Sequence, residues 1–481
     1  MQPSVVLINP PLSLADRYGK DMQKFGAVSE PLGLAYIAAY LETVDVPVRI
    51  IDAPALKLGI DDVIEDLSRQ VDAVVGITLL TPAFKVVADL CSAIKQSFPD
   101  RVIVLGGAHP TALPERTLQE IPAVDIVCIG EGEVSMSEIV SDSLRKDRRL
   151  NVINGICYRD EQEIIMTEMR TAVRDLDLIP PPARHLLPME KYHLTASRVS
   201  GAGFCPTIIV ARGCPFSCTY CSRTFGKTFR AHSIDRIISE IKSLIADYGV
   251  KQINVEADTL TVKNKFITEL CNALIEQKIS EKVKWTCESR VDTVNENLLR
   301  LMKQAGCWQI SYGVETGTQR LLDMINKSVS LQQIEDIFAL TKRIGISIRG
   351  FFMLGLPSET REDSLATIAF AKKLDPLWAQ FTVTVPYPGT KMFDDLDSSG
   401  KIRNYDWSTY NTWSGWKERQ ALPFVAEGRT MEELVKLQKQ ALRQFYVRPK
   451  VIFRFLKNMR SIYDLQKYLV GFYVLAKSKF S

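Results

Sequence analysis

Short apolar runs alternate with helical patterns along the first 150 residues of this 481-residue chain. The apolar runs are rich in β-branched residues, which is typical of buried strands. They lie at residues 5–8, 48–51, 73–77, 102–105 and 125–129, and the helical patterns between them lie at residues 32–42, 61–70, 83–96 and 133–144. This alternation predicts a parallel sheet covered on both faces by helices, a Rossmann-like (flavodoxin-like) domain over residues 1–150.

In such a sheet a ligand binds beyond the carboxyl ends of the strands. The predicted strands here run into polar or glycine-rich turns. These turns contain Asn9 and Pro10, Thr78 and Thr81, Gly106, Gly107 and His109, and Gly130 and Glu131. Glycine lets the backbone approach a ligand closely, but ordinary strand-to-helix turns contain the same residues. On the residues alone, both interpretations stay open.

Residues 151–205 predict a connector between two domains. Two short runs at 157–160 and 164–166 indicate a small hairpin. The stretch 175–182 ends in three consecutive prolines, which can neither pair in a sheet nor continue a helix. A domain boundary is therefore expected near residues 180–205.

The strand–helix alternation restarts after the connector. Predicted strands lie at 207–210, 252–256, 283–287, 309–313, 347–354 and 378–385, with helices centred near 240, 270, 300, 335 and 368. Six such units predict a partial (β/α)6 TIM-type barrel over residues 206–420, with its chemistry at the carboxyl ends of the strands. Residues 421–481 are expected to form a helical, basic C-terminal segment.

Three cysteines, Cys214, Cys218 and Cys221, come after the first predicted barrel strand at the spacing C-x3-C-x2-C. Three thiolates this close are soft ligands for zinc or for an iron–sulfur cluster. A structural zinc needs a fourth ligand, which His232 or Cys205 could supply. A four-iron cluster held by three cysteines instead leaves one iron open to an outside ligand. The rest of the chain favours the cluster, because its pattern is that of an enzyme and not of a zinc ribbon.

The cysteine loop, with Tyr220 before its last cysteine, resembles the cluster motif of the radical S-adenosylmethionine (SAM) enzymes. The resemblance implies a [4Fe-4S] cluster on the three cysteines, whose open iron binds the amino and carboxylate groups of SAM. Reductive cleavage of SAM then gives a 5′-deoxyadenosyl radical. The resemblance also implies that SAM is bound by Tyr220, Glu256, Arg290, Glu315, Gly355, Glu359 and Pro388.

Two of these residues carry a specific expectation. Arg290 could pair bidentately with the methionine carboxylate, a geometry that lysine would not reproduce. Glu315 could accept hydrogen bonds from the ribose or the amino group. Each charged residue at these strand ends could equally form a salt bridge on the rim of the barrel.

The N-terminal domain is similar to the cobalamin-binding domain that precedes the radical domain in one branch of this family. The matching features are Asn9-Pro10-Pro11, residues 31–41, residues 105–111 and residues 130–133. The resemblance implies that cobalamin binds at Asn9, Pro10, Thr78, Thr81, Gly106, Gly107, His109, Gly130 and Glu131. The D-x-H-x-x-G motif that supplies a histidine to cobalt is absent, so cobalamin is expected without a histidine on its lower face.

The resemblance is to class B radical SAM methyltransferases, so methylation of an unactivated carbon in a small molecule is expected, with a ferredoxin or flavodoxin as electron donor. Two alternatives stay open. One is oxidative cyclisation or another rearrangement of a porphyrin- or lipid-like substrate. The other is a non-catalytic cobalamin or redox sensor. The sequence identifies no catalytic residue beyond those that bind the cofactors.

The net charge and the hydropathy pattern limit the classes of partner that the chain is expected to have. The net charge is only +4, which does not favour a nucleic-acid partner. The chain has no leader-like N-terminus and no membrane-spanning apolar run, so a cytoplasmic location is expected. The basic, aromatic-rich stretch 443–479 is interpreted as a helical cap on the barrel. The alternative is peripheral contact with an anionic membrane or a lipid-like substrate.

Overall fold

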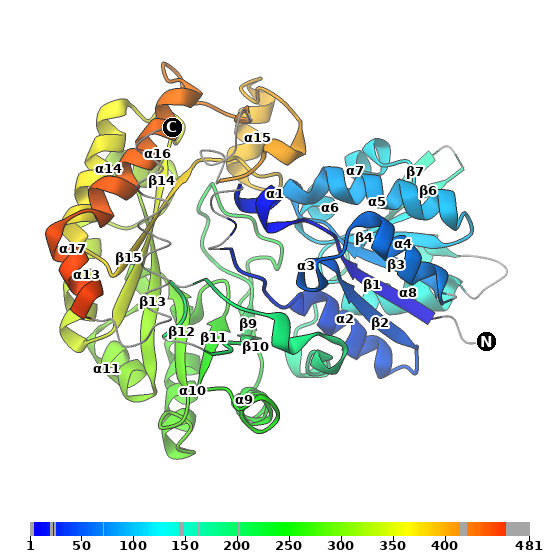
Figure 1. The fold of residues 1–481 in the computed structure, drawn as a ribbon, viewed down its shortest axis with the longest axis horizontal. Helices are drawn as coiled ribbons and strands as arrows, with labels where there is room; N and C mark the ends of the chain where they lie inside the picture. The colour runs from blue at the N-terminus through cyan, green and yellow to red at the C-terminus, as the bar shows by residue number, and fades with distance from the viewer. Residues whose placement is uncertain are drawn as a thin grey trace.

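The structure is a computed structural model that describes residues 4–19, 23, 26–70, 72–143, 149–161, 163–195, 197–200, 203–412 and 421–457. Figure 1 shows two α/β lobes side by side, the N-terminal lobe in blue to cyan and the second lobe in green to yellow. The predicted α/β class and the order of the two sheets along the chain are confirmed. Within the described ranges, no helix combines the length and the apolar character needed to cross a membrane.

The sheet of the N-terminal lobe has the strand order β2-β1-β3-β4-β5-β6-β7. Its first five strands are parallel, and the last two form an antiparallel hairpin that pairs with β5. The strands are β1 (Ser4–Asn9), β2 (Val48–Asp52), β3 (Asp72–Thr78), β4 (Val102–Gly106), β5 (Ile126–Cys128), β6 (Ile156–Asp160) and β7 (Glu163–Met166). The hairpin predicted in the connector therefore extends this sheet.

Helices cover both faces of this sheet because its strands are apolar on both sides. One face packs against α2 (Leu32–Glu42) and α8 (Glu133–Ser143), and the other against α4 (Ile60–Ser68), α5 (Phe84–Ser97) and α7 (Pro114–Glu120). Shorter helices occupy the turns: α1 (Leu14–Tyr18), α3 (Ala53–Leu56), α6 (Ala108–Ala112) and the 3-10 turns η2 (Thr81–Ala83) and η3 (Leu150–Val152).

The second sheet has six parallel strands in the order β15-β14-β13-β12-β11-β8, which is the predicted open barrel. The strands are β8 (Thr207–Ile209), β11 (Gln252–Glu256), β12 (Lys284–Ser289), β13 (Cys307–Glu315), β14 (Ser347–Leu354) and β15 (Trp378–Val383). The helices are α9 (Ile234–Tyr248), α10 (Asn264–Glu276), α11 (Glu296–Gln304), α12 (Gln319–Met324), α13 (Leu331–Ile344), α14 (Arg361–Leu374) and α15 (Lys391–Ser398). Short 3-10 turns are η4 (Leu176–Leu178), η5 (Arg184–Leu186), η6 (Met189–Lys191), η7 (Leu260–Val262), η8 (Val291–Thr293) and η9 (Trp407–Thr409).

The two sides of this second sheet differ in chemistry. Alternate residues such as Ile253 and Val255 on β11 belong to the apolar core shared with the helices. The residues between them point the other way, into the barrel, because successive side chains in a strand alternate in direction. On β11 these are Gln252, Asn254 and Glu256. The interior of the barrel is therefore polar, unlike the aliphatic filling of a closed TIM barrel.

The C-terminal helices α16 (Met431–Tyr446) and α17 (Pro449–Lys457) lie on the outer side of the second lobe (Figure 1). The Tyr446 hydroxyl accepts a hydrogen bond from the Ala379 N–H at 2.9 Å and donates to the Ala379 carbonyl at 2.9 Å. It thereby satisfies the backbone N–H and carbonyl of Ala379 on the edge strand β15, which would otherwise be open to pairing. The rest of the predicted basic segment, residues 458–481, lies outside the described residues.

A buried arginine in the connector joins the two lobes. Arg184 donates to Glu240 on α9 at 2.6 Å and to the Thr207 carbonyl on β8 at 2.6 Å, and it lies 3.5 Å from Glu30 of the N-terminal lobe. Glu30 in turn accepts from the Thr207 N–H at 2.9 Å. This network places the first barrel strand against the entry to α2.

Candidate functional site

A pocket lies at the carboxyl ends of barrel strands β11 to β14, where a parallel barrel gathers its chemistry. It holds about 820 Å³ of space free of protein atoms, part of which is open solvent. All three cysteines of the motif line it. Its other lining residues are Phe216, Tyr220, Ser222, Arg223, Gly226, Asp258, Thr259, Glu288, Ser289, Arg290, Ser311, Gly313, Glu315, Lys327 and Phe351.

The three cysteines lie on the loop between β9 (Ala211–Arg212) and β10 (Arg230–Ala231), two short antiparallel strands that close the loop at its base. Gly213 begins the loop with φ +90°, and a Cβ at this position would lie 2.1 Å from the Thr228 carbonyl oxygen. Only glycine allows the two ends of the loop to approach this closely. The Gly213 N–H donates to Asp258 at 2.6 Å, which ties the loop to the end of β11.

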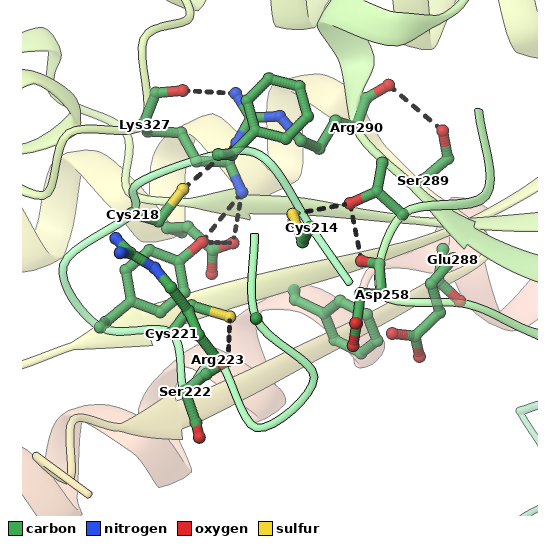
Figure 2. A pocket seen from close by; sticks show the side chains of 18 residues that line it. Cys214, Cys218, Cys221, Ser222, Arg223, Asp258, Glu288, Ser289, Arg290 and Lys327 are labelled. Carbon is green, nitrogen blue, oxygen red and sulfur yellow. Dashed lines mark hydrogen bonds and ion pairs between the residues drawn. The ribbon is translucent and has the colours of Figure 1, made fainter. Parts of the chain in front are cut away.

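The cysteine thiols contact three different walls of the pocket. Cys214 lies 3.5 Å from the Thr259 hydroxyl, Cys218 accepts a hydrogen bond from Arg290 at 3.2 Å, and Cys221 contacts the carbonyl of the next residue. Figure 2 shows Arg290 and Lys327 on one side of the cysteines and Asp258 and Glu288 on the other. Burial and the two neighbouring thiols raise the pKa of Cys221 to about 11.

The two candidates for a fourth zinc ligand lie away from these thiols. His232 is paired with Asp177 at 3.1 Å and stacks on Tyr36, while Cys205 is buried in a separate apolar cluster. Neither lines the pocket. Across the described residues, no three His, Cys, Asp or Glu side chains already surround a metal-ion position, the three thiols included. Three sulfur donors without either candidate fourth ligand fit a cluster with one open iron better than tetrahedral zinc.

A buried acid–base pair forms the wall beside Cys218 and Cys221. A bulge at the end of β13 and a left-handed backbone at Glu315, with φ +68°, turn this side chain toward the pocket. Glu315 accepts hydrogen bonds from the Tyr220 hydroxyl at 2.7 Å and from Lys327 Nζ at 2.8 Å. A Cβ at Gly313 would lie 2.2 Å from the Glu315 carboxylate, so glycine makes room for the pair.

Lys327 is a pocket residue that the sequence analysis missed. Its side chain is only 5% exposed, and lysine is almost never buried without a partner. Asn326 and Ser328 on either side have φ of 54° and 56°, in the left-handed region, and this turn directs the lysine inward. A single lysine in a turn after α12 has no periodicity that would reveal it.

Arg290 is committed to its own loop. Its Nε and Nη2 atoms form a bidentate pair with Asp292 at 2.9 and 2.8 Å, and Nη2 also donates to the Lys327 carbonyl at 2.6 Å. Nη1 donates to Cys218 Sγ, and the guanidinium lies over the Phe216 ring. The bidentate geometry expected toward the SAM carboxylate is therefore made with Asp292.

Four other predicted SAM-binding residues lie outside the lining of this pocket. Glu256, at the end of β11, is exposed to solvent. Surrounding protein atoms and the charge of Glu288 nevertheless raise its pKa. Pro388 is buried in the loop that follows β15.

The remaining two, Gly355 and Glu359, shape the turn after β14. The Glu359 carboxylate is 1% exposed, accepts from the Leu356 N–H at 2.8 Å and accepts from the Ser364 hydroxyl. Burial raises its pKa. Gly355 has φ +80° and packs against Leu434 of α16. These contacts show a structural role for both residues, and their SAM contacts stay predictions.

The polar groups predicted to bind cobalamin at the carboxyl edge of the N-terminal sheet are largely paired with other groups of the protein. Asn9 donates to the buried Asp52 at 2.8 Å, and Thr81 lies 3.2 Å from His109 Nδ1. The Gly130 N–H donates to Thr111 at 3.0 Å.

What this edge presents to a ligand is therefore mostly backbone and apolar surface. Thr78, Gly106, Gly107 and Gly130 are all part-exposed there, whereas Pro10 is buried. Leu80 is an apolar residue at this edge, with 51% of its surface exposed.

His109 is enclosed between the two lobes. Its ring is 1% exposed and meets Phe84 and Trp407 edge-on at 5.1 and 5.0 Å. Burial and the charge of Arg116 lower its pKa to about 4, so the ring is neutral at physiological pH. The His109 ring is therefore enclosed by protein, and its contact with cobalamin stays a prediction.

Glu131 joins the N-terminal lobe to the base of the cysteine loop. Its carboxylate pairs with Arg212 on β9 at 3.2 Å and with Arg230 on β10 at 2.8 Å, and all three side chains are less than 10% exposed. Burial opposes ionisation, but hydrogen bonds and charge from Arg230 and Arg212 lower the pKa of Glu131. The turn after β5 is thus held directly against the loop that bears the three thiols.

Comparisons with known proteins give the same assignment for both lobes. Residues 208–371 match the radical SAM superfamily, and residues 21–140 match the B12 binding domain. An uncharacterized methyltransferase of Pyrococcus horikoshii is 34% identical over 94% of this chain and 94% of its own. An anaerobic magnesium-protoporphyrin IX monomethyl ester cyclase of Rubrivivax gelatinosus is 31% identical over 79% of this chain and 68% of its own.

Solved structures share the fold of the whole chain. The radical SAM methyltransferase TsrM from Kitasatospora setae, with cobalamin and a [4Fe-4S] cluster bound, aligns with a TM-score of 0.70 at 14% identity, covering 94% of this chain and 90% of that one. The cobalamin-dependent radical enzyme OxsB aligns with a TM-score of 0.73 at 17% identity, covering 99% and 71%. Together with the domain matches and the 34% identical relative, these findings show that the chain belongs to the cobalamin-binding radical SAM enzymes, whose cofactors are a [4Fe-4S] cluster, SAM and cobalamin.

Proposed function

We propose that the protein is a cobalamin-dependent C-methyltransferase that acts on a small molecule. The observation that carries this proposal is the pocket in which three thiols, without a fourth ligand from His232 or Cys205, adjoin the Glu315–Lys327 pair. When bound, the cluster and SAM supply a carbon radical, and cobalamin supplies a methyl group. The protein's own residues bind these groups, orient them and exclude water.

Individual roles follow from the contacts. Cys214, Cys218 and Cys221 would hold the cluster. SAM presents an ammonium and a carboxylate side by side, and Glu315 with Lys327 offers the complementary pair of charges 2.8 Å apart. Tyr220, which donates to Glu315, would fix the direction of that carboxylate.

Contacts between the lobes support a substrate site between the two cofactors. Gly389, in the loop after β15, lies so close to α6 of the N-terminal lobe that a Cβ there would be 2.9 Å from that of Ala112. Trp407 packs on His109 and donates to Glu120 at 2.6 Å. The carboxyl ends of the two sheets therefore lie together, as transfer between a cobalamin and a SAM site requires.

The test uses protein reconstituted anaerobically with iron, sulfide and cobalamin, a chemical reductant, and SAM labelled with carbon-13 in its methyl group. We expect 5′-deoxyadenosine and S-adenosylhomocysteine, with the labelled methyl in a component of a small-molecule extract. Formation of 5′-deoxyadenosine with a product that has lost hydrogen and gained no label would favour oxidative cyclisation, which the 31% identical cyclase supports. Absence of 5′-deoxyadenosine would favour the sensor.

Arg290 gives a prediction that separates two roles. Lysine cannot keep the fork on Asp292 together with the bond to Cys218 Sγ, so R290K should lose the N–H···S hydrogen bond. Because hydrogen bonds to sulfur help to set cluster potentials, we expect a lower midpoint potential by redox titration monitored by electron paramagnetic resonance, with SAM affinity little changed. R223K is the matched control, because Arg223 lines the same pocket. If R290K left the midpoint potential unchanged and weakened SAM binding, Arg290 would instead be assigned to the SAM carboxylate.

The finer partner predictions also belong to the proposal. A ferredoxin or flavodoxin would deliver the electron in the cytoplasm, and a porphyrin- or lipid-like substrate stays the alternative to other small molecules. Peripheral membrane contact is supported by α17, where Phe453 and Leu456 are 69% and 58% exposed. Beside them, Lys450 and Arg454 share the acid Asp375 with a further arginine, so the helix is basic.

Flotation with vesicles tests this contact. We expect the full chain to float with anionic vesicles and to lose that binding when Phe453 and Leu456 are both replaced by serine, because apolar burial and charge act together at such surfaces. Neutral vesicles are the control. If the chain does not float with anionic vesicles, membrane contact is rejected and this segment is a helical cap on the barrel.

A further inference from the structure

One arginine inside the barrel has no acidic ion-pair partner among the described residues. Arg349 is the third residue of β14 and is 7% exposed. Its one hydrogen bond among the described residues goes from Nη2 to the neutral amide of Gln380 on β15, and its Nη1 is buried without a partner. No carboxylate within the described ranges lies in ion-pair range of it.

An uncompensated buried cation is costly, because removal from water is not offset by a counter-charge. The nearby cation Arg198 is already paired with Glu288 at 2.6 Å. Burial and the charge of Arg198 lower the pKa of Arg349 to about 10, which still leaves it charged at neutral pH. Glu288 acts on Arg349 through its charge but is paired with Arg198, so no carboxylate among the described residues pairs directly with the positive charge of Arg349.

Arg349 borders the pocket of the three cysteines. Its register partner on β13 is Ser311, which lines the pocket and is itself in register with Glu288 on β12, another lining residue. Two residues further along β14, Phe351 also lines the pocket, and its ring centre lies 4.8 Å from the Arg349 guanidinium. Arg349 is not itself a lining residue, so it lies just behind the floor that Ser311 and Phe351 form, against the Phe351 ring.

Another polar side chain near this floor has hydrogen-bonding atoms without partners among the described residues. Gln309 precedes Ser311 by two residues on the same side of β13, is fully buried, and has no hydrogen-bond partner at either amide atom. Buried polar groups normally find partners, so these atoms indicate a site completed by a ligand.

We propose that Arg349 binds an anionic group of the small-molecule substrate, a carboxylate or a phosphate, at the floor of the barrel. The inference rests on the proposed function, since it takes the barrel interior as the substrate site. A guanidinium offers several N–H donors to such oxygens, and Nη1 is the donor left free here. Phe351 would contact the apolar part of the same molecule, toward the cluster.

The test measures anion binding to the reconstituted holoenzyme by its thermal unfolding midpoint. The probes are acetate and inorganic phosphate, with acetamide as the neutral control. The variants are R349M, which removes the charge at similar length, and R300M, in which an exposed arginine on α11 is changed in the same way. We expect a saturable rise in midpoint with at least one anion for wild type and R300M, and no such rise for R349M. The anion that acts at lower concentration identifies the group.

Two further measurements make the test decisive. Without any anion, R349M should be at least as stable as wild type, because it lacks an unpaired buried charge. If R349M does not fold, R349K replaces it, and its half-saturating anion concentration should rise because the fork is lost. The proposal is overturned if R349M, or R349K in its place, responds as wild type does, or if wild type responds no more to the anions than to acetamide.

The experiments distinguish failure of the anion site from failure of the proposed function. An anion response without SAM cleavage by wild type would sink the function and leave the anion site standing. SAM cleavage without an anion response would sink the anion site alone.

Discussion

Replacement of Cys214, Cys218 or Cys221 by alanine should abolish both cluster assembly and cleavage of SAM. Each thiol contributes one of the three sulfur donors in the pocket, and a cluster held by two would have a second open iron. We expect iron and sulfide contents near zero after anaerobic reconstitution and no detectable 5′-deoxyadenosine. Iron analysis and chromatography of the reaction mixture measure both.

The matched control is C205A. Cys205 is 3% exposed among apolar residues, away from the pocket, so its loss removes a thiol without touching the site. Full iron content is expected for C205A. Loss of iron in C205A together with zinc in the wild-type protein would revive the tetrahedral site and contradict the cluster.

Replacement of Glu131 by glutamine should destabilise the protein by about 3 kcal/mol, because it leaves Arg230 and Arg212 buried with one acid fewer. Urea unfolding of the cofactor-free protein, at matched concentrations, gives the difference. The pKa of Glu131 is lowered in the folded state, so its contribution is complete at neutral pH and is lost as the pH falls through that lowered pKa. The gap between wild type and E131Q should therefore close in acid.

E138Q is the control for this change. Glu138 pairs with Arg170 in the same lobe, but its side chain is 42% exposed, so its loss should cost less than about 1 kcal/mol. Equal effects of E131Q and E138Q would show that the contact between the lobe and the cysteine loop contributes no special stability.

The sequence predicts most of the fold because burial on both faces leaves a strong local pattern. Strands such as 252–256 and 347–354 appear at the predicted bounds, and α2 spans the predicted residues. The ribbon of β9 and β10 was missed, because two-residue strands carry no periodicity. The hairpin of β6 and β7 was found, but its pairing with β5 could not be, since an antiparallel edge strand depends on contacts distant in sequence.

The residues of the candidate site are also predicted only in part. The cysteine spacing reveals the loop, and Tyr220, Arg290 and Glu315 do line the pocket with it. What the sequence does not reveal is which partner each charge takes. Arg290 is engaged by Asp292, two residues away, and Glu131 by arginines more than eighty residues away. Lys327 and Arg349 become visible only when burial and pairing are known.

The most direct test of the central claim is electron–nuclear double resonance on the reduced protein with SAM labelled with nitrogen-15 at its amino group and carbon-13 at its carboxylate. We predict hyperfine coupling of both labels to the cluster, because the iron that lacks a cysteine binds those two groups. A reduced cluster whose spectrum shows no coupling to either label would contradict the claim that three thiols leave one iron open to SAM.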